Sequence, residues 1–459
     1  VSVRTGSGDI KLASGGDIKL TDDTSTIYTA GKPTETARYG TLNELTVGYV
    51  LYGEYPVEGG DVFLQAGKNI QGAITSQFIS PWLVRQGSWT NNIHQPTAWA
   101  VALGYTNFVG NAADSSAPLF KQNVGSFGGG KVDVVATGDI NDLSVMMPTT
   151  GKQMGEPLAD PNDPNPPTFD FKTNVVQVNG GGEMRVSAGG DIAGGAYFLG
   201  QGQGSLSADG AIKGGSQFTA GPQLVMGDAK IDLLSKKDVQ LTAVTDPMII
   251  HSGNVNFYTY GDGSAVNIKS LSGDVHLGAD VLKIGEFLAF DATQKTLAQV
   301  YPGSLESTAF SGSVILDNSI NLYPTPKGKL HLLAAQDITS NVIKERLGMS
   351  DADPALLPTY LFPVLEQNLV SVLNRIDPFG VPALAHKATP LHAGDNEPVR
   401  LVATKGDIKN IEFNTAKKAL IQTGRDFRNV LLSVQHPNLN DTTILNIGRD
   451  LFYTSDRSS

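Results

Sequence analysis

Apolar and polar residues alternate along most of this chain in short runs, and many of the runs end at a glycine followed by an aspartate. In the clearest run, residues 131–140, Val132, Val134 and Ala136 occupy alternate positions before a Gly-Asp-Ile phrase. Alternation with a period of two predicts a half-buried β-strand, and the glycine predicts a bend before a second short strand.

The Gly-Asp phrase recurs through the sequence, with Ile or Val after it. Its aspartates are Asp9, Asp17, Asp61, Asp139, Asp191, Asp274 and Asp407. Where related phrases follow one another closely, as from residue 407 to residue 426, the interval is about 20 residues, which is typical of one coil of a parallel β-solenoid. A single coil buries its apolar side chains only against its neighbours, so we predict roughly 16 coils stacked about 4.8 Å apart.

We interpret these seven aspartates as turn residues. Glycine adopts positive φ without steric cost, and aspartate bonds its own backbone in a turn. The alternative is that they are catalytic or calcium-binding carboxylates, but such chemistry needs two or three acids on one face. The repeat places one acid at each bend, so we predict no catalytic residue.

Three segments interrupt the repeat. The first, residues 73–127, contains all 3 tryptophans, and its aromatic residues include Trp82, Trp89, Trp99 and Tyr105. Aromatic side chains on a long loop suit the binding of a sugar or a protein, and we take these four as candidate binding residues. The alternative is a small additional core that holds the loop against the coils.

The second interruption, residues 147–171, is rich in proline, aspartate and asparagine, and we predict a loop rather than a strand. The third, residues 341–398, contains an apolar stripe at three- and four-residue intervals between Asp353 and Ile376, which predicts one α-helix followed by a polar loop. The remaining ranges, 1–72, 128–146, 172–340 and 399–459, are predicted to be coils.

Metal, thiol and nucleic-acid chemistry find little support in the composition. The chain has no cysteine, which excludes disulfides, thiolate catalysis and cysteine-based zinc sites. His386, His392, Asp395 and Glu397 are close in sequence, but their spacing matches no strong zinc signature. The net charge of −11 disfavours nucleic acid as a partner. We therefore predict no metal and no cofactor.

The phrases at residues 7–18, 65–70 and 423–429 resemble the repeats of filamentous haemagglutinin-like large exoproteins, the passengers of bacterial two-partner secretion. The resemblance implies an all-β, right-handed parallel β-helix, a solenoid that carries loop insertions. It also implies export through an outer-membrane β-barrel transporter and location on, or release from, the surface of a Gram-negative bacterium. Members of the family act as adhesins, as biofilm components or as stalks for a toxin.

From this resemblance we expect a non-catalytic, structural and adhesive segment of a secreted fibre. The expected partners are the β-barrel transporter, further segments of the same long chain, and a host or bacterial surface glycan or protein. The chain opens at Val1 inside a repeat and without the charged and apolar segments of a signal peptide, which favours a processed product or an internal piece. Two alternatives stay open: a β-helical enzyme that degrades polysaccharide, and a stalk that carries a distal toxin.

Overall fold

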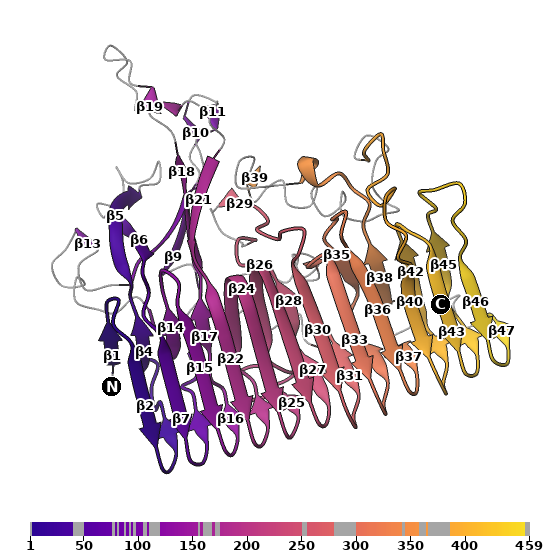
Figure 1. Ribbon diagram of the computed structural model, residues 1–459, viewed down its shortest axis with the longest axis horizontal. Helices are drawn as coiled ribbons and strands as arrows, with labels where there is room; N and C mark the ends of the chain where they lie inside the picture. Colours follow the sequence, from indigo (N-terminus) through magenta and orange to yellow (C-terminus); the bar gives the residue numbers. More distant parts are fainter. Residues whose placement is uncertain are drawn as a thin grey trace.

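In the computed structural model the chain forms a parallel β-helix, a rod whose N-terminal half carries a second, antiparallel sheet beside it (Figure 1). The structure describes residues 2–39, 50–75, 79, 82–86, 89–90, 93–94, 98–103, 108–109, 120–154, 157–158, 168–169, 175–249, 255–279, 300–341, 345–357, 364–365 and 386–454. The prediction of an all-β solenoid is confirmed.

The rod has three faces, and each coil contributes one strand to each face. The first face contains β2 (Ile10–Ser14), β7 (Val62–Ala66), β15 (Lys131–Ala136), β22 (Gly182–Ala188), β24 (Ala196–Ala208), β26 (Gln223–Ser235), β30 (Ala265–Ser270), β33 (Ser304–Ala309), β36 (Lys329–Ala334), β40 (Val399–Ala403), β43 (Ala419–Thr423) and β46 (Ile444–Ile447). The second face contains β3 (Ile18–Lys19), β8 (Ile70–Gln71), β16 (Ile140–Asn141), β23 (Ile192–Ala193), β25 (Ile212–Lys213), β27 (Val239–Leu241), β31 (Val275–Leu277), β34 (Val314–Leu316), β37 (Ile338–Ser340), β41 (Ile408–Lys409), β44 (Phe427–Arg428) and β47 (Leu451–Phe452).

The third face is built in two sections. Its N-terminal section contains β1 (Ser2–Thr5), β4 (Thr26–Thr29), β14 (Val124–Ser126), β17 (Val145–Met147), the first halves of β24 and β26, and β28 (Ala243–Thr245). Its C-terminal section contains β32 (Val300–Tyr301), β35 (Ile320–Leu322), β38 (Glu345–Met349), β42 (Ile411–Thr415) and β45 (Leu431–Val434). The strands of all three faces pair in parallel with their neighbours, so inward-facing side chains of equal register form continuous rows along the axis.

The number of coils differs from the expectation. The second face is a 12-stranded sheet, so the described part of the chain forms about 12 coils instead of the expected 16. At the usual strand spacing, the rod is roughly 55 Å long. The expectation was too high because residues 32–57 leave the rod as the strands β5 and β6, although they were expected to be coils.

A row of side chains, here called the corner ladder, runs along the corner before the second face. Its members are the residues directly before each strand of that face: Asp17, Asn69, Asp139, Asp191, Ala211, Asp238, Asp274, Ser313, Asp337, Asp407, Asp426 and Asp450. The Asp139 carboxylate accepts a hydrogen bond from the backbone N–H of Asp191 in the next coil at 2.8 Å, and Asp191 accepts one from Ala211 at 2.8 Å. Each such bond to a charged acceptor contributes about 1.5–3 kcal/mol, so the ladder ties successive coils together.

The glycine before a ladder residue has a different function from the one predicted. None of the glycines before the seven Gly-Asp aspartates has a positive φ, although all of them lie in the described part of the chain. Instead, a Cβ at Gly190 would overlap with the Asp139 carboxylate, and a Cβ at Gly406 would overlap with that of Asp337. Glycine therefore leaves room for the carboxylate of the preceding coil.

Bond lengths along the corner ladder follow this rule. Where glycine precedes the donor residue, the bond from its N–H to the ladder side chain measures 2.7 to 2.9 Å. Where Lys68, Gln336, Arg425 or Arg449 stands in place of that glycine, the bond measures 3.1 to 3.3 Å. The Cβ of the larger residue holds the acceptor further away.

The ladder carboxylates also pair with cations. Lys213 forms an ion pair with Asp191, and Lys409 forms one with Asp337. Burial alone would raise the pKa of Asp191, but its bonds with the Lys213 ammonium and the Ala211 N–H outweigh burial, and the pKa lies below its ordinary value of 3.8. The same balance, with Lys409 and the Asp407 N–H as donors, lowers the pKa of Asp337.

The antiparallel sheet, here called the side sheet, is formed by excursions that leave the rod between coils. It contains β5 (Lys32–Tyr39), β6 (Val50–Val57), β9 (Leu83–Gln86), β12 (Ala98–Val101), β13 (Phe108–Val109), β18 (Thr149–Met154) and β21 (Val175–Gly180). Three two-stranded pairs accompany these sheets: β10 (Trp89–Thr90) with β11 (Ile93–His94), β19 (Pro157–Leu158) with β20 (Thr168–Phe169), and β29 (Val255–Asn256) with β39 (Val364–Leu365). In Figure 1 most of the side sheet stands above the N-terminal half of the rod.

Several predicted boundaries are therefore wrong. Residues 32–57 were expected to be coils, but they contain the antiparallel strands β5 and β6. The proline-rich range 147–171 was expected to be a loop, but β18 and β21 pair antiparallel across it, and so do β19 and β20. Proline tolerates an edge strand, so the composition did not exclude a hairpin.

The predicted helix between residues 353 and 376 is wrong where the structure describes that segment. Pro354–Leu356 form a short 3-10 helix, η2, with Asp353 as N-cap, and Val364–Leu365 form strand β39. Residues 358–363 and 366–385 lie outside the described residues. Pro354, Pro358 and Pro363 disfavour a continuous helix over the start of this segment, because proline lacks a backbone N–H and clashes with the preceding helical turn.

The described residues form two hydrophobic cores. One fills the rod, and the other, here called the outer cluster, lies between the third face and the side sheet. In β24 the consecutive residues Ala196, Tyr197, Phe198 and Leu199 are all buried: Tyr197 and Leu199 point into the rod, whereas Ala196 and Phe198 belong to the outer cluster. Strands covered on both faces lose the apolar-polar alternation.

Candidate functional site

The predicted aromatic binding residues lie in different environments. Trp82 and Trp99 are buried, with 0% and 1% of their surface exposed. Trp82 packs edge-on against Phe120 and Phe127, with ring centroids 5.4 and 5.9 Å apart. Trp82 and Trp99 therefore form no exposed aromatic surface, and both belong to the outer cluster, in agreement with the alternative of an additional core. Trp99 also lines the cleft described below.

The other two candidates are not tested. Trp89 lies in β10, but its side chain is not among those described, and Tyr105 lies outside the described residues. A binding role for Trp89 and Tyr105 stays a prediction.

The seven aspartates of the repeated phrase are all at bends of the rod, where they bind backbone. Asp17, Asp139, Asp191, Asp274 and Asp407 belong to the corner ladder and accept N–H groups of the next coil. At the corner before the first face, Asp9 accepts the N–H of Asp61 at 3.0 Å, and Asp61 accepts that of Lys131 at 2.8 Å. Their acceptor bonds run between coils rather than within one turn, which corrects the predicted mechanism.

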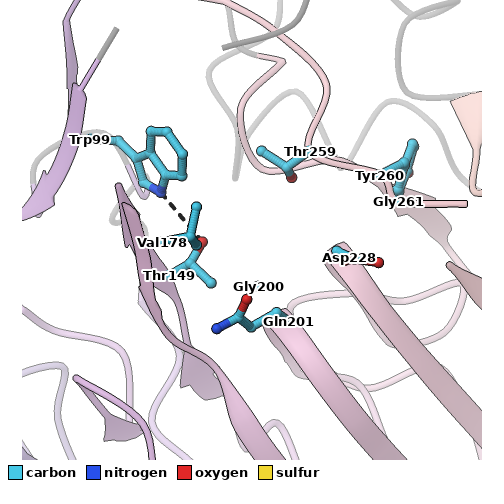
Figure 2. A pocket seen from close by; sticks show the side chains of 9 residues that line it. All are labelled: Trp99, Thr149, Val178, Gly200, Gln201, Asp228, Thr259, Tyr260 and Gly261. Atoms are coloured by element: carbon cyan, nitrogen blue, oxygen red, sulfur yellow. Dashed lines mark hydrogen bonds between the residues drawn. The ribbon is translucent and has the colours of Figure 1, made fainter. Parts of the chain in front are cut away.

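The candidate site is a cleft of about 250 Å³ where the side sheet meets the rod, here called the junction cleft (Figure 2). Its lining residues come from the side sheet, from the bends of β24 and β26, and from the loop before β30: Trp99, Thr149, Val178, Gly200, Gln201, Asp228, Thr259, Tyr260 and Gly261. These residues span more than 160 positions of the sequence, so only the fold brings them together.

The side-sheet wall of the cleft depends on Trp99. The indole Nε1 of Trp99 donates a hydrogen bond to the Thr149 hydroxyl at 3.3 Å, as Figure 2 shows. Trp99 pairs with Gly151 of β18, and a Cβ at Gly151 would overlap with the indole ring. Glycine at this position therefore allows the ring to lie across the neighbouring strand.

On the rod side of the cleft, residues 259–261 are held in place by a buried carboxylate, Asp246, which does not itself line the cleft. Asp246 accepts hydrogen bonds from the N–H of Met248 at 2.8 Å, and from the N–H and hydroxyl of Thr259 at 2.6 and 3.0 Å. Burial raises the pKa of Asp246 to about 7, against these hydrogen bonds, which favour the charged form. Asp246 thus fixes the segment that contributes Thr259, Tyr260 and Gly261 to the cleft.

The described lining of the cleft offers polar and charged groups to a ligand. Among the lining residues in the described part of the chain, Asp228 is the one carboxylate. Glycoside hydrolysis needs a pair of carboxyl groups on either side of the scissile bond, and the corner-ladder aspartates already bind backbone N–H groups. Hydroxyl, amide and carboxylate groups beside aromatic walls are typical of a site that holds a small polar ligand.

The polar residues considered for a metal site do not converge. His386 pairs with Asp351 at 3.0 Å, whereas Glu397 lies 3.2 Å from the Lys329 ammonium. His392 is buried beside Asp395, and burial lowers its pKa to about 4, which keeps its ring neutral. In the described ranges no three His, Asp or Glu side chains are grouped so that they could hold a metal ion.

A second, more open cavity of about 440 Å³ lies near the C-terminal end of the rod, beside His386 and His436. His386 is held by Asp351, and His436 shares a hydrogen bond of 2.9 Å with the Thr443 hydroxyl. These partners occupy one nitrogen of each ring, and the junction cleft is the more enclosed of the two cavities.

Comparison of the chain with protein-family models, with curated proteins and with solved structures finds no match. Among the helices in the described part of the chain, none is long and apolar enough to cross a membrane.

Proposed function

We propose that this chain is a structural and adhesive segment of a large secreted exoprotein, in which the rod is a rigid shaft and the side sheet carries the contact site. The observation that carries the proposal is the corner ladder: the repeated carboxylates bind backbone from coil to coil, so the repeat serves the stiffness of the shaft. The single carboxylate in the junction cleft supports binding without catalysis.

The resemblance of the repeats to filamentous haemagglutinin-like exoproteins supports the location and the partners in this proposal. The chain would reach the surface of a Gram-negative bacterium through an outer-membrane β-barrel transporter. Further segments of the same long chain would extend the shaft, and a surface glycan or protein would be the adhesive target.

Attachment of the purified chain to cells tests the proposal. Beads coated with the folded chain should be retained by bacterial or epithelial cell layers, whereas beads coated with the heat-unfolded chain should wash off. Incubation with a panel of polysaccharides should release no reducing ends. Equal retention of folded and unfolded chain would contradict an adhesive role, and depolymerisation would favour the enzyme alternative.

A further inference from the structure

Hydrogen-bond acceptors predominate in the junction cleft. The Asp228 carboxylate is exposed, and no hydrogen bond or ion pair connects it with the described residues. Gln201 donates one Nε2–H to the Gly180 carbonyl at 2.8 Å, which leaves the amide oxygen as an acceptor and the second Nε2–H as a donor. Thr259 donates its hydroxyl proton to Asp246, so its lone pairs are also available.

Donors are fewer. The Thr149 hydroxyl accepts the Trp99 Nε1–H, so its own proton is available to a ligand. The Tyr260 hydroxyl donates to the Val300 carbonyl at 3.0 Å and is occupied. With one negative charge and an excess of acceptors, the cleft is complementary to a ligand that brings positive charge and several N–H groups.

Glycines keep the cleft open. A Cβ at Gly261 would overlap with the Asp228 carboxylate, and a Cβ at Gly227 would lie 2.6 Å from the Thr259 hydroxyl and 2.5 Å from the Gly200 carbonyl. A side chain at either position would push aside the groups that line the cleft. Neither glycine needs a positive φ, so the space that the missing Cβ leaves is what these positions require.

We propose that the junction cleft binds a primary ammonium group carried on a short aliphatic chain or a sugar ring. Asp228 supplies the opposite charge, and Gln201 and Thr259 accept the remaining N–H groups. Trp99 and Val178 line the side-sheet wall and offer apolar surface to the methylene groups of the ligand. The net charge of −11 attracts cations and repels acidic sugars. A lysine side chain and an amino sugar share this chemistry, and the inference rests on the proposed adhesive function.

Calorimetric titration of the whole chain tests the proposal with four probes. Nα-acetyl-lysine methylamide and glucosamine carry the ammonium group, whereas Nα-acetyl-norleucine methylamide and glucose lack it. We expect the ammonium probes to bind and the neutral ones to bind at least about tenfold more weakly, because a charge-assisted hydrogen bond is lost. Stronger binding of the lysine probe would indicate a protein as the source of the ligand, and stronger binding of glucosamine would indicate a glycan.

Two variants locate the site. Asp228→Asn should weaken ammonium binding about tenfold or more, whereas Asp232→Asn, which removes the same charge from an exposed position of the same strand, should change it less than about twofold. Circular dichroism and the thermal midpoint check that both variants fold. Equal binding of glucose and glucosamine, no binding of either ammonium probe, or unchanged binding by Asp228→Asn would overturn the proposal.

The cell-attachment assay separates this inference from the proposed function. If Asp228→Asn abolishes ammonium binding but coated beads are still retained, adhesion stands and uses another surface. If the chain binds ammonium probes but beads coated with it are not retained, the cleft stands and the adhesive role fails.

Discussion

The rod and the side sheet are stabilised in different ways. In the rod, neighbouring coils repeat the same contacts: parallel strands in register, rows of apolar side chains inside, and a corner-ladder bond to the next coil. The side sheet has antiparallel strands from separate excursions, and its interior is an irregular cluster of aromatic rings. A repeat specifies the first kind of structure locally, whereas the second depends on residues far apart in sequence.

The substitution with the largest expected effect on stability is Trp82→Ala, which tests whether the rod and the side sheet unfold separately. Removing a fully buried indole from the outer cluster should cost about 3–5 kcal/mol of stability, because a cavity remains. Native-state hydrogen exchange should show lost protection in the side sheet and in third-face strands such as β14 and β17, while the C-terminal coils stay protected. Uniform loss of protection along the rod would mean that the two regions are a single cooperative unit.

The pH dependence of stability should have opposite signs at Asp246, beside the junction cleft, and at the carboxylates of the corner ladder. Asp246 has a raised pKa of about 7, so between about pH 4 and 7 the unfolded state loses a proton that the folded state keeps. Stability should therefore fall as the pH rises through this range, by on the order of 3 kcal/mol. Asp246→Asn should remove this slope in denaturant unfolding at pH 5 and pH 8, and a slope that persists in the variant would assign it to other groups.

The lowered pKa values of Asp191 and Asp337 act in the other direction. Their contribution is present above about pH 4 and is lost as the pH falls through their folded values, below 3.8. Unfolding of the rod in acid therefore has a source separate from the titration of Asp246.

A double-mutant cycle at Asp139 and Gly190 tests whether glycine is needed to make space for the carboxylate. Asp139→Ala should cost about 1.5–3 kcal/mol through the lost bond to Asp191, whereas Asp139→Asn should keep most of it, since Asn69 fills the equivalent position. Gly190→Ala should destabilise the protein that retains Asp139 but cost much less in the Asp139→Ala background, because the overlapping carboxylate is gone. Additive losses in thermal unfolding would contradict the explanation.

The smallest expected effect is a gain in stability. Ala211 interrupts the corner ladder because its side chain has no hydrogen-bond acceptor. In the next coil, Lys237 directly precedes Asp238, at the position that Gly190 occupies before Asp191. The double variant Ala211→Asp with Lys237→Gly should add a hydrogen bond to the Asp238 N–H and stabilise the protein by about 0.5–1.5 kcal/mol. Ala211→Asp alone should gain less, because the Lys237 Cβ crowds the new carboxylate. An equal gain from the single variant would contradict the role assigned to glycine.

The sequence predicted the rod well because its signal is local and repeated. The alternation in residues 131–136 and the Gly-Asp phrase after it were sufficient for strand, bend and stacking. They did not reveal that the carboxylate bonds the next coil, since a single bend also suits a turn aspartate. Only the comparison of neighbouring coils in space shows why glycine precedes it.

The side sheet and the junction cleft were less accessible to sequence reasoning. One overlooked signal is the unbroken apolar run Ala196–Leu199, where the alternation fails because both faces are covered. The cleft has no local signal: Thr149, Gln201, Asp228 and Thr259 lie on separate segments, and none stands out by residue type. Their proximity follows from the way β18 and β21 leave the rod and return.

The corner ladder also has a polarity. Each acceptor belongs to the earlier coil and each donor to the later one, as Asp139 accepts from Asp191 and Asp191 from Ala211. A coil that has already formed therefore presents one ladder acceptor to the coil that follows. If the rod forms coil by coil from its N-terminal end, each new coil finds its hydrogen-bond acceptor already in place.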